Sequence, residues 1–272
     1  MKYSVLMSVY KKDNPDFLKA ALKSIYEEQT KKPNEIVVVF DGTLTDELYT
    51  TLDEFRKDKE DFVFYYPQEV NRGLGEALRI GAEKCTGDYI FRMDSDDISL
   101  PDRFEKQSAY VESHPEIDVL GGCIAEFKKS PEGENMRLRV CPKKHSDIMK
   151  MGKRRNPMNH VTVCIKTESL HKCGSYETVL LLEDYYLWMK MAAEGCCLEN
   201  MEDTLVYVRA DEGFDERRAE GRIKGWKQLQ TLMVKNKQIS RFNAMINMII
   251  IIGFTYCPVG VRRFVYDKLL RS

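Results

Sequence analysis

Three aspartates within four residues, Asp94, Asp96 and Asp97, are the strongest chemical signal in the sequence. They directly follow the short apolar run 89–93 (YIFRM), so a buried strand is expected to end in an acidic loop. Neighbouring carboxylates repel one another, and such a cluster is unfavourable unless a positive charge neutralises it. Hard divalent cations prefer oxygen ligands of this kind. The stretch alone leaves three interpretations open: a metal site, a solvated acidic loop, or the cap of the following helix.

The first 100 residues alternate between strand-like and helical segments. The apolar runs that predict strands are 3–9, 35–40, 62–66 and 89–93. Asn14 and Pro15 predict a capped helix start after the first run. Continuous apolar strands separated by helices are typical of a parallel sheet covered on both faces, which binds ligands beyond the carboxyl ends of its strands. Tyr10, Asp41 and the acidic loop all follow strand ends, and their expected convergence favours a binding site over a solvated loop.

The pattern is less regular after residue 100. It predicts a helix from Pro101 to about His114 and a helix after Glu183-Asp184, together with strands over 118–127, 160–165 and 205–209. Within 136–157 only a short helix near 145–150 is predicted. These segments are expected to extend the sheet begun by the first half.

The composition changes at about residue 212. Charged helical sequence over 216–237 is followed by the apolar run 243–261 and then by the basic residues Arg262, Arg263, Lys268 and Arg271. A membrane span requires about 20 apolar residues, and this run is shorter. Two interpretations stay open for the tail: a basic amphipathic segment on a membrane surface, or a pair of helices packed on the rest of the chain.

The bulk composition excludes several classes of protein. The 272 residues carry a net charge of −1, which gives no electrostatic argument for nucleic-acid binding. The eight cysteines form no CxxC pair, which favours reduced thiols in a cytosolic setting, and the four histidines have no cysteine at zinc-finger spacing. No signal peptide is expected, since Met1-Lys2-Tyr3 leads straight into a strand.

Four segments together resemble a known family. They are YSVLMSVY (3–10), EIVVVFDG (35–42), NRGLGEALRIGAEKCTGDYIFRMDSDDISLPDRF (71–104) and LLEDYYLWMKMAAEG (181–195). Their order and separation resemble the family 2 glycosyltransferases of bacterial capsule, exopolysaccharide and lipopolysaccharide synthesis. The resemblance implies an α/β GT-A fold with a Rossmann-like, mostly parallel sheet flanked by helices. It implies a catalytic domain over 1–211, with a nucleotide-sugar half (1–100) and an acceptor half (101–211), followed by a helical tail over 212–272.

The resemblance also implies which residues bind the donor: Ser8, Tyr10, Asp41, Arg72, Asp94 and Asp96. The Tyr10 ring would offer a flat surface for the nucleotide base. The Asp41 carboxylate would accept hydrogen bonds from the uridine, and the Arg72 guanidinium suits phosphate. By local sequence alone, Tyr10 is better explained as a core or loop tyrosine and Asp41 as a turn residue, while a surface arginine explains Arg72 equally well.

The segment Asp94-Ser95-Asp96 matches the DxD motif of the family. Asp96 would ligate Mg²⁺ or Mn²⁺, and Asp94 would contact the ribose or metal-bound water, while Asp97 would support the loop or cap the next helix. The cation would act as a Lewis acid for the departing diphosphate.

The pair Glu183-Asp184 resembles the ED motif, in which the aspartate is the general base for the acceptor hydroxyl and the glutamate supports it. A helix N-terminus that favours acidic residues explains the same pair without catalysis. His160 and Arg209 are candidate contacts for the acceptor or for phosphate; a core histidine explains His160 equally well.

No QxxRW sequence follows the ED motif and no multi-span region is present, which disfavours a processive polymer synthase. The resemblance therefore implies an inverting, metal-dependent enzyme that transfers one sugar from a nucleotide-sugar, expected to be a UDP-sugar, to a saccharide or polyprenyl-linked saccharide. It is expected in the cytoplasm, and it would be peripheral on the cytoplasmic face of the membrane if 243–272 contacts the inner leaflet. The alternatives are a sugar nucleotidyltransferase, although 3–14 contains no Gly-rich phosphate loop, and a non-catalytic sugar-nucleotide-binding scaffold. The oligomeric state is not predicted.

Overall fold

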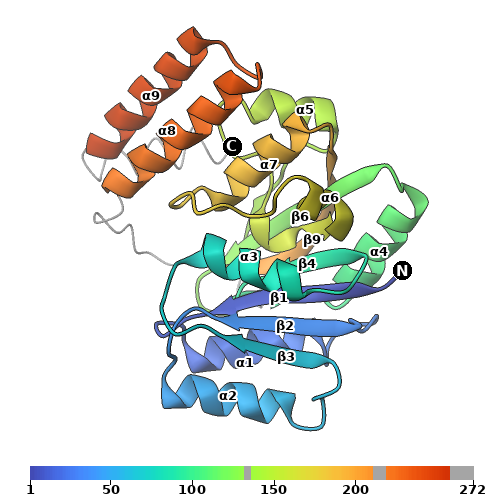
Figure 1. Ribbon diagram of the computed structural model, residues 1–272. Coiled ribbons are helices and arrows are strands. Elements are labelled where there is room, and N and C mark those ends of the chain that lie inside the picture. Colours follow the sequence, from blue (N-terminus) through green and yellow to red (C-terminus); the bar gives the residue numbers. More distant parts are fainter. Residues whose placement is uncertain (132–135, 211–218, 258–272) are drawn as a thin grey trace.

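A computed structural model describes residues 1–131, 136–210 and 219–257 of the protein. A mixed β-sheet forms its centre (Figure 1). In this part of the chain the sheet has nine strands in the order β3-β2-β1-β4-β8-β6-β9-β5, with β7 paired to β6. The strands are β1 Tyr3–Val9, β2 Glu35–Phe40, β3 Val63–Pro67, β4 Tyr89–Met93, β5 Ile98–Ser99, β6 Ile117–Phe127, β7 Arg137–Arg139, β8 Cys164–Lys166 and β9 Cys197–Arg209.

The first four strands confirm the parallel sheet expected from their apolar runs. β2 and β4 both pair with β1 in parallel, and β3 pairs with β2 in parallel. Every residue of β2 and of β4 is buried, as continuous apolar strands require when helices cover both faces. The carboxyl ends of β1, β2 and β4 therefore lie at the same edge of the sheet.

The second half of the sheet is mixed. β8 pairs antiparallel with both β4 and β6, β9 pairs parallel with β6, and the short strands β5 and β7 add antiparallel edges. The predicted strand over 160–165 was partly wrong, because His160–Thr162 is a 3-10 helix and the strand begins at Cys164. The predicted strand over 205–209 is only the end of β9.

Helices cover the two faces of the sheet. They are α1 Pro15–Ile25, α2 Asp46–Arg56, α3 Leu74–Lys84, α4 Arg103–Ser113, α5 His145–Met151, α6 Thr167–Lys172 and α7 Glu183–Ala193. One core cluster joins the sheet to α1, α2 and α4, and a second joins its other face to α3, α5, α6 and α7. Asn14 caps α1 as predicted, since its side chain accepts from the N–H groups of Asp16 and Phe17. The helix expected at Pro101 begins only at Arg103.

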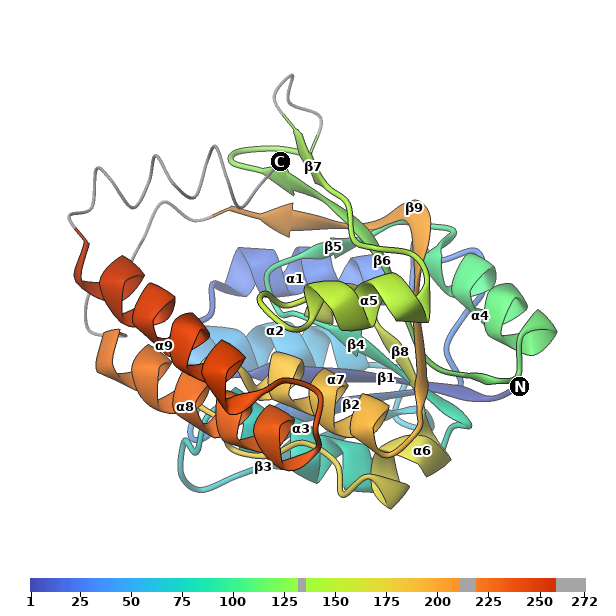
Figure 2. The same cartoon turned by 90° about the horizontal axis from the view of Figure 1, so that it is seen from above.

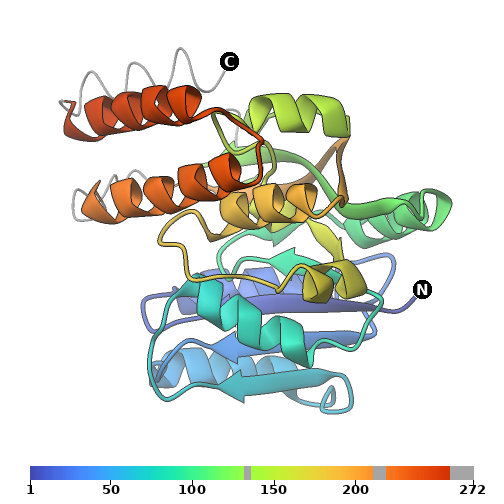
Figure 3. The ribbon, with the colours of Figure 1, turned by 45° about the horizontal axis from the view of Figure 1, so that its top comes forward.

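Two further helices, α8 (Ala219–Lys235) and α9 (Arg241–Tyr256), lie beyond α7 (Figures 2 and 3). They form a third apolar cluster with the outer face of α7, in which Tyr185 and Met189 meet Trp226, Leu229 and Met233. Residues 219–257 therefore contain two packed helices, as one interpretation of the tail predicted, while contact of the tail with a membrane stays a prediction. The expected start of the charged helix at 216–218, the end of the apolar run and the basic residues from Arg262 to Arg271 lie outside the described residues.

Across residues 1–131, 136–210 and 219–257, no helix has both the length and the apolar character that crossing a membrane demands.

Candidate active site

A cavity of about 450 Å³ lies at the edge where β1, β2 and β4 end. It brings together nearly all of the predicted donor-site residues with several that were not predicted: Ser8, Tyr10, Asp13, Asp41, Asn71, Arg72, Gly73, Leu74, Gly75, Asp94, Ser95, Asp96, Thr178, Val179, Leu180, Leu181 and Glu183. The parallel register of the three strands explains this convergence, because it aligns the loops that follow them. The expectation that separate stretches meet at one sheet edge is confirmed.

The acidic loop after β4 forms the deepest charge cluster of this cavity. One oxygen from each of Asp94, Asp96 and Asp97 lies within 4.8 Å of the others. Burial, with Asp94 and Asp13 nearby, raises the pKa of Asp96 to about 6. Burial also raises the pKa of Asp97, and Asp94 and Asp96 raise it further. Three convergent carboxylates fit a hard divalent cation, which would relieve the repulsion between them.

Arg92, in the middle of β4, is the positive group closest to this cluster. Its side chain is buried and forms an ion pair with Asp94. Its Nε atom has no hydrogen-bond partner among the described residues. A single arginine within a run of apolar strand residues was the sequence signal for this group, and the sequence analysis assigned it no role. A buried guanidinium partly neutralises the loop but leaves a net negative charge for a cation.

Asp13, an acidic residue, is the second residue of this site to which the sequence analysis assigned no role. Its Oδ2 accepts from the Ser95 hydroxyl at 2.7 Å and from the Tyr10 N–H at 3.0 Å. Burial raises the pKa of Asp13 to about 6. These bonds tie the loop after β1 to the acidic loop after β4, so Tyr10 and Asp96 are held on one connected framework.

Asp41 shapes the cavity through the turn that carries Arg72. Its carboxylate accepts from the N–H groups of Arg72 at 2.7 Å and Gly73 at 3.0 Å, and its carbonyl accepts from the Asn71 side chain at 3.1 Å. Asp41 is therefore both a wall of the cavity and the anchor of the neighbouring turn. Gly42 has a φ of +88°, and a Cβ there would lie 2.9 Å from the Asn71 nitrogen, so this close contact requires glycine.

Glu183 and Asp184, the predicted catalytic carboxylates, lie in the first turn of α7. Glu183 lines the cavity, whereas Asp184 does not; its Oδ2 accepts from the Asn156 side chain at 2.5 Å. Burial raises the pKa of Glu183 to about 7, with a further contribution from Asp184. Burial likewise raises the pKa of Asp184, while the Tyr185 N–H and Asn156 oppose this rise by stabilising the charged form. A carboxylate with a raised pKa beside a donor cavity is suited to proton abstraction.

His160 and Arg209 do not line the cavity. The His160 Nε2 atom lies 3.1 Å from the Tyr176 hydroxyl, and its ring packs edge-on against Trp188. The Arg209 guanidinium lies over the rings of Phe17 and Phe127, 3.6 and 4.7 Å from their centroids, and its Nε donates to the Asp96 carbonyl. The Arg209 backbone N–H also donates to Asp97 at 2.8 Å, so Arg209 supports the acidic loop from outside the cavity.

The model of the family "Glycosyl transferase family 2" matches residues 4–180, which is more than half of the chain and includes the loops that build the cavity. The chain belongs to glycosyltransferase family 2.

Two bacterial relatives of this family 2 glycosyltransferase match almost end to end. An amylovoran biosynthesis glycosyltransferase, AmsE of Erwinia amylovora, is 36% identical over 98% of both chains. An Escherichia coli enzyme named UDP-Gal:alpha-D-GlcNAc-diphosphoundecaprenol beta-1,3-galactosyltransferase is 35% identical over 99% of this chain and 97% of its own.

Solved structures confirm the GT-A fold of this family 2 glycosyltransferase. The structure of S. aureus TarS (residues 1–349) in complex with UDP-GlcNAc has a TM-score of 0.71, at 17% identity, over 99% of this chain and 76% of TarS. Mannosyltransferase PcManGT from Pyrobaculum calidifontis, in complex with GDP-Man and Mn²⁺, has a TM-score of 0.63 at 14% identity over 98% of this chain and 79% of its own.

Gly75, in the first turn of α3, is where the two halves of the glycosyltransferase site come closest. A Cβ at this position would lie 2.9 Å from the Glu177 carbonyl oxygen and 3.3 Å from the Glu183 Cβ. Only a residue without a side chain permits this separation between α3 and the N-terminus of α7. The turn 71–73 and Glu183 thereby line the same cavity.

Proposed function

We propose that this family 2 glycosyltransferase is an inverting, metal-dependent enzyme of bacterial surface polysaccharide biosynthesis, moving one sugar from a UDP-sugar to a lipid-linked saccharide. The observation that carries the proposal is the single cavity lined by Asp94, Asp96 and Glu183, with Asp184 next to Glu183 in the first turn of α7. The E. coli relative is named for a UDP-sugar donor and a diphosphoundecaprenol-linked acceptor, and it matches nearly the whole chain, which supports this choice of substrates.

In the proposed donor complex, Tyr10 and Asp41 contact the nucleoside, and Ser8 and Arg72 complete the pocket. Asp96 and Asp94 would hold Mg²⁺ or Mn²⁺. When bound, the cation would supply Lewis-acid stabilisation to the departing diphosphate. Arg92 and the Asp13–Ser95 bond keep the carboxylates of the loop in place before the donor arrives.

In the proposed reaction, Asp184 takes the proton of the acceptor hydroxyl while its oxygen attacks the anomeric carbon. The bond from that carbon to the diphosphate oxygen breaks on the opposite face, so the configuration inverts. Asn156 orients the Asp184 carboxylate, and Glu183 faces the donor side. The enzyme is proposed to work at the cytoplasmic face of the membrane, with peripheral contact through 243–272.

The test is a panel of sugar nucleotides incubated with the purified protein, Mg²⁺ or Mn²⁺, and a short lipid-diphosphate-linked saccharide. Release of free nucleoside diphosphate together with a product of inverted anomeric configuration, read by NMR, is the expected result. A nucleotidyltransferase would transfer no sugar in this assay and would instead release inorganic diphosphate in a parallel assay that supplies a nucleoside triphosphate and a sugar 1-phosphate. Donor binding without turnover on any acceptor would indicate a scaffold.

A further inference from the structure

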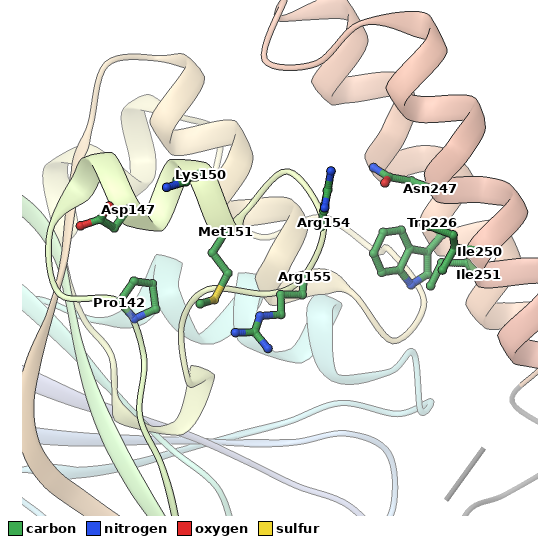
Figure 4. Close-up of a pocket in the computed structure, with 10 residues that line it drawn as sticks. All are labelled: Pro142, Asp147, Lys150, Met151, Arg154, Arg155, Trp226, Asn247, Ile250 and Ile251. Carbon is green, nitrogen blue, oxygen red and sulfur yellow. The ribbon is translucent and has the colours of Figure 1, made fainter. Parts of the chain in front are cut away.

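A second cavity, of about 570 Å³, lies between α5 and the helices α8 and α9 (Figure 4). One wall comes from α5 and the turn after it, and the other comes from α8 and α9. The lining residues are Pro142, Asp147, Lys150, Met151, Arg154, Arg155, Trp226, Asn247, Ile250 and Ile251. None of them lines the donor cavity, so the reaction proposed above leaves this space unused.

The chemistry of the second cavity is opposite to that of the first. Lys150, Arg154 and Arg155 bring three positive charges to its first wall, against the single carboxylate of Asp147. Within the ranges that the structure describes, Lys150 and Arg154 form no ion pair, so their charges are available to a ligand. The indole of Trp226, with Ile250 and Ile251, makes the second wall apolar. A basic wall facing an apolar wall fits an amphiphile with an anionic head.

The cavity opens onto an exposed apolar helix face. Ile250 belongs both to the cavity lining and to a row of exposed apolar side chains on α9. That row consists of Phe242, Met245, Ile246, Ile249, Ile250, Ile252 and Tyr256. The side chains of Ile249 and Ile250 are 62% and 59% exposed. A hydrocarbon chain that leaves the cavity past Ile250 would therefore remain on apolar surface.

The walls are fixed relative to each other and to the proposed base. The Asn247 side chain donates to the Lys153 carbonyl and to the Gln230 side chain, both at 2.9 Å, and so ties α9 to the first wall and to α8. Arg155 precedes Asn156, whose side chain holds Asp184. The Trp226 ring packs edge-on against Tyr185, the residue after Asp184, with centroids 5.8 Å apart. Two lining residues of the second cavity are thus linked to Asp184: Arg155 precedes its hydrogen-bond partner Asn156, and Trp226 packs on its chain neighbour Tyr185.

We infer that the cavity bounded by α5, the turn 152–155, α8 and α9 binds the phosphate groups and first hydrocarbon units of an isoprenoid-diphosphate-linked acceptor. The inference rests on the proposed function in taking that acceptor to be lipid-linked. Lys150 and Arg154 contact the phosphates, Trp226 and Ile251 contact the lipid, and the attached sugar extends past Asn156 to Asp184. The acceptor and the donor then meet at the α7 N-terminus.

Calorimetric titration with farnesyl diphosphate tests this inference without requiring turnover. The titration is done in EDTA with excess UDP, so that binding in the donor cavity is suppressed. We expect farnesyl diphosphate to bind at least about tenfold more tightly than either inorganic diphosphate or farnesol, because only the first engages both walls. Equal binding of inorganic diphosphate would reduce the site to an anion site and overturn the inference.

The matched variants are Lys150→Gln with Arg154→Gln, and, as a control, Lys57→Gln with Lys172→Gln. All four side chains are exposed, so both pairs remove two surface charges without disturbing the core. The first pair is expected to weaken farnesyl diphosphate binding about tenfold or more, since each lost charge-assisted hydrogen bond to phosphate is costly. The control pair should bind like the wild type. Equal affinity in both pairs would refute the site.

The same variants separate this inference from the proposed function. With a phosphate-free glycoside of the acceptor sugar, the first pair should transfer as well as the wild type, and only the lipid-diphosphate acceptor should show a raised KM. If no acceptor is glycosylated but farnesyl diphosphate binding still depends on Lys150 and Arg154, the proposed function fails while the binding site stands. If transfer proceeds and the KM for the lipid-linked acceptor is the same in the variant as in the wild type, the proposed binding site is wrong.

Discussion

The two cavities beside the α7 N-terminus are of similar size but are built in different ways. The donor cavity is acidic, and its residues follow strand ends whose positions are fixed by parallel pairing. The second cavity is basic and apolar, and its walls are surfaces of helices that come from 142–155 and from 226–251. Strand ends place polar groups accurately enough for chemistry, whereas helix surfaces offer area for a larger and less defined ligand. Asp184 lies where the two constructions meet.

The substitution Asp184→Asn is the most sensitive test of this difference between the two cavities. Loss of a general base lowers kcat by about 10²- to 10⁴-fold, while the nucleotide-sugar and farnesyl diphosphate should both bind as in the wild type. Rapid-quench assays of transfer and calorimetry on each ligand measure this. Full activity would remove Asp184 from the mechanism, and a large loss in Glu183→Gln alone would transfer the role of base to Glu183.

Asp96→Asn should affect only the donor side. Removing one charge from the metal-ligand set is expected to lower kcat/KM by about a hundredfold, since metal stabilisation of a leaving group contributes several kcal/mol. Chelation of the wild type with EDTA should give a similar loss that added Mn²⁺ or Mg²⁺ restores. Asp53→Asn, an exposed aspartate on α2, serves as the control. Activity that survives both EDTA and Asp96→Asn would argue for a metal-independent enzyme.

Asp41→Asn tests how far the donor cavity depends on its anchored turn. The neutral amide is a weaker acceptor for the two N–H groups of Arg72 and Gly73, and the loss of about one charged hydrogen bond should raise the donor KM about tenfold. The KM for the acceptor should not change. Initial rates over a grid of both substrate concentrations separate the two effects. An unchanged donor KM would show that the turn keeps its shape without this carboxylate.

The smallest expected effect concerns pH and the boundary between the cavities. The Asp184 carboxylate must be deprotonated to act, so kcat is retained above its pKa and lost as the pH falls through it. Burial raises this pKa, and the Asn156 hydrogen bond opposes the rise. Asn156→Ala should therefore move the acidic limb of the kcat–pH profile to higher pH. A limb that stays in place, or moves to lower pH, would contradict the role of Asn156.

The sequence was sufficient for the donor side because its signals are local. Apolar runs located β1, β2 and β4, and the carboxylates that follow them were visible by their spacing. Asp13 was missed because its role comes from the Asp13–Ser95 bond, which joins residues 82 positions apart in the chain, whereas Arg92 was visible as a lone arginine in an apolar run and was assigned no role. Likewise, the sequence suggested a phosphate contact for Arg209 but not its position between two aromatic rings.

The acceptor side was less accessible for the same reason. Strand β8 has three residues and pairs antiparallel with two neighbours, and the apolar run 160–165 located it only in part because that run begins with a 3-10 helix. The apolar run after residue 243 left open whether it packs or faces a membrane. The structure shows that α9 packs through Asn247 and Ile251 while Ile249 remains exposed, which a composition count cannot separate.

Gly75 has a consequence for how this enzyme tolerates change. A Cβ at this position would lie 2.9 Å from the Glu177 carbonyl oxygen and 3.3 Å from the Glu183 Cβ, so a side chain there requires the segment before α7 to shift away from α3. The separation between the turn 71–73 and Glu183 thus depends on the absence of a single methyl group, and Gly75→Ala is expected to widen it.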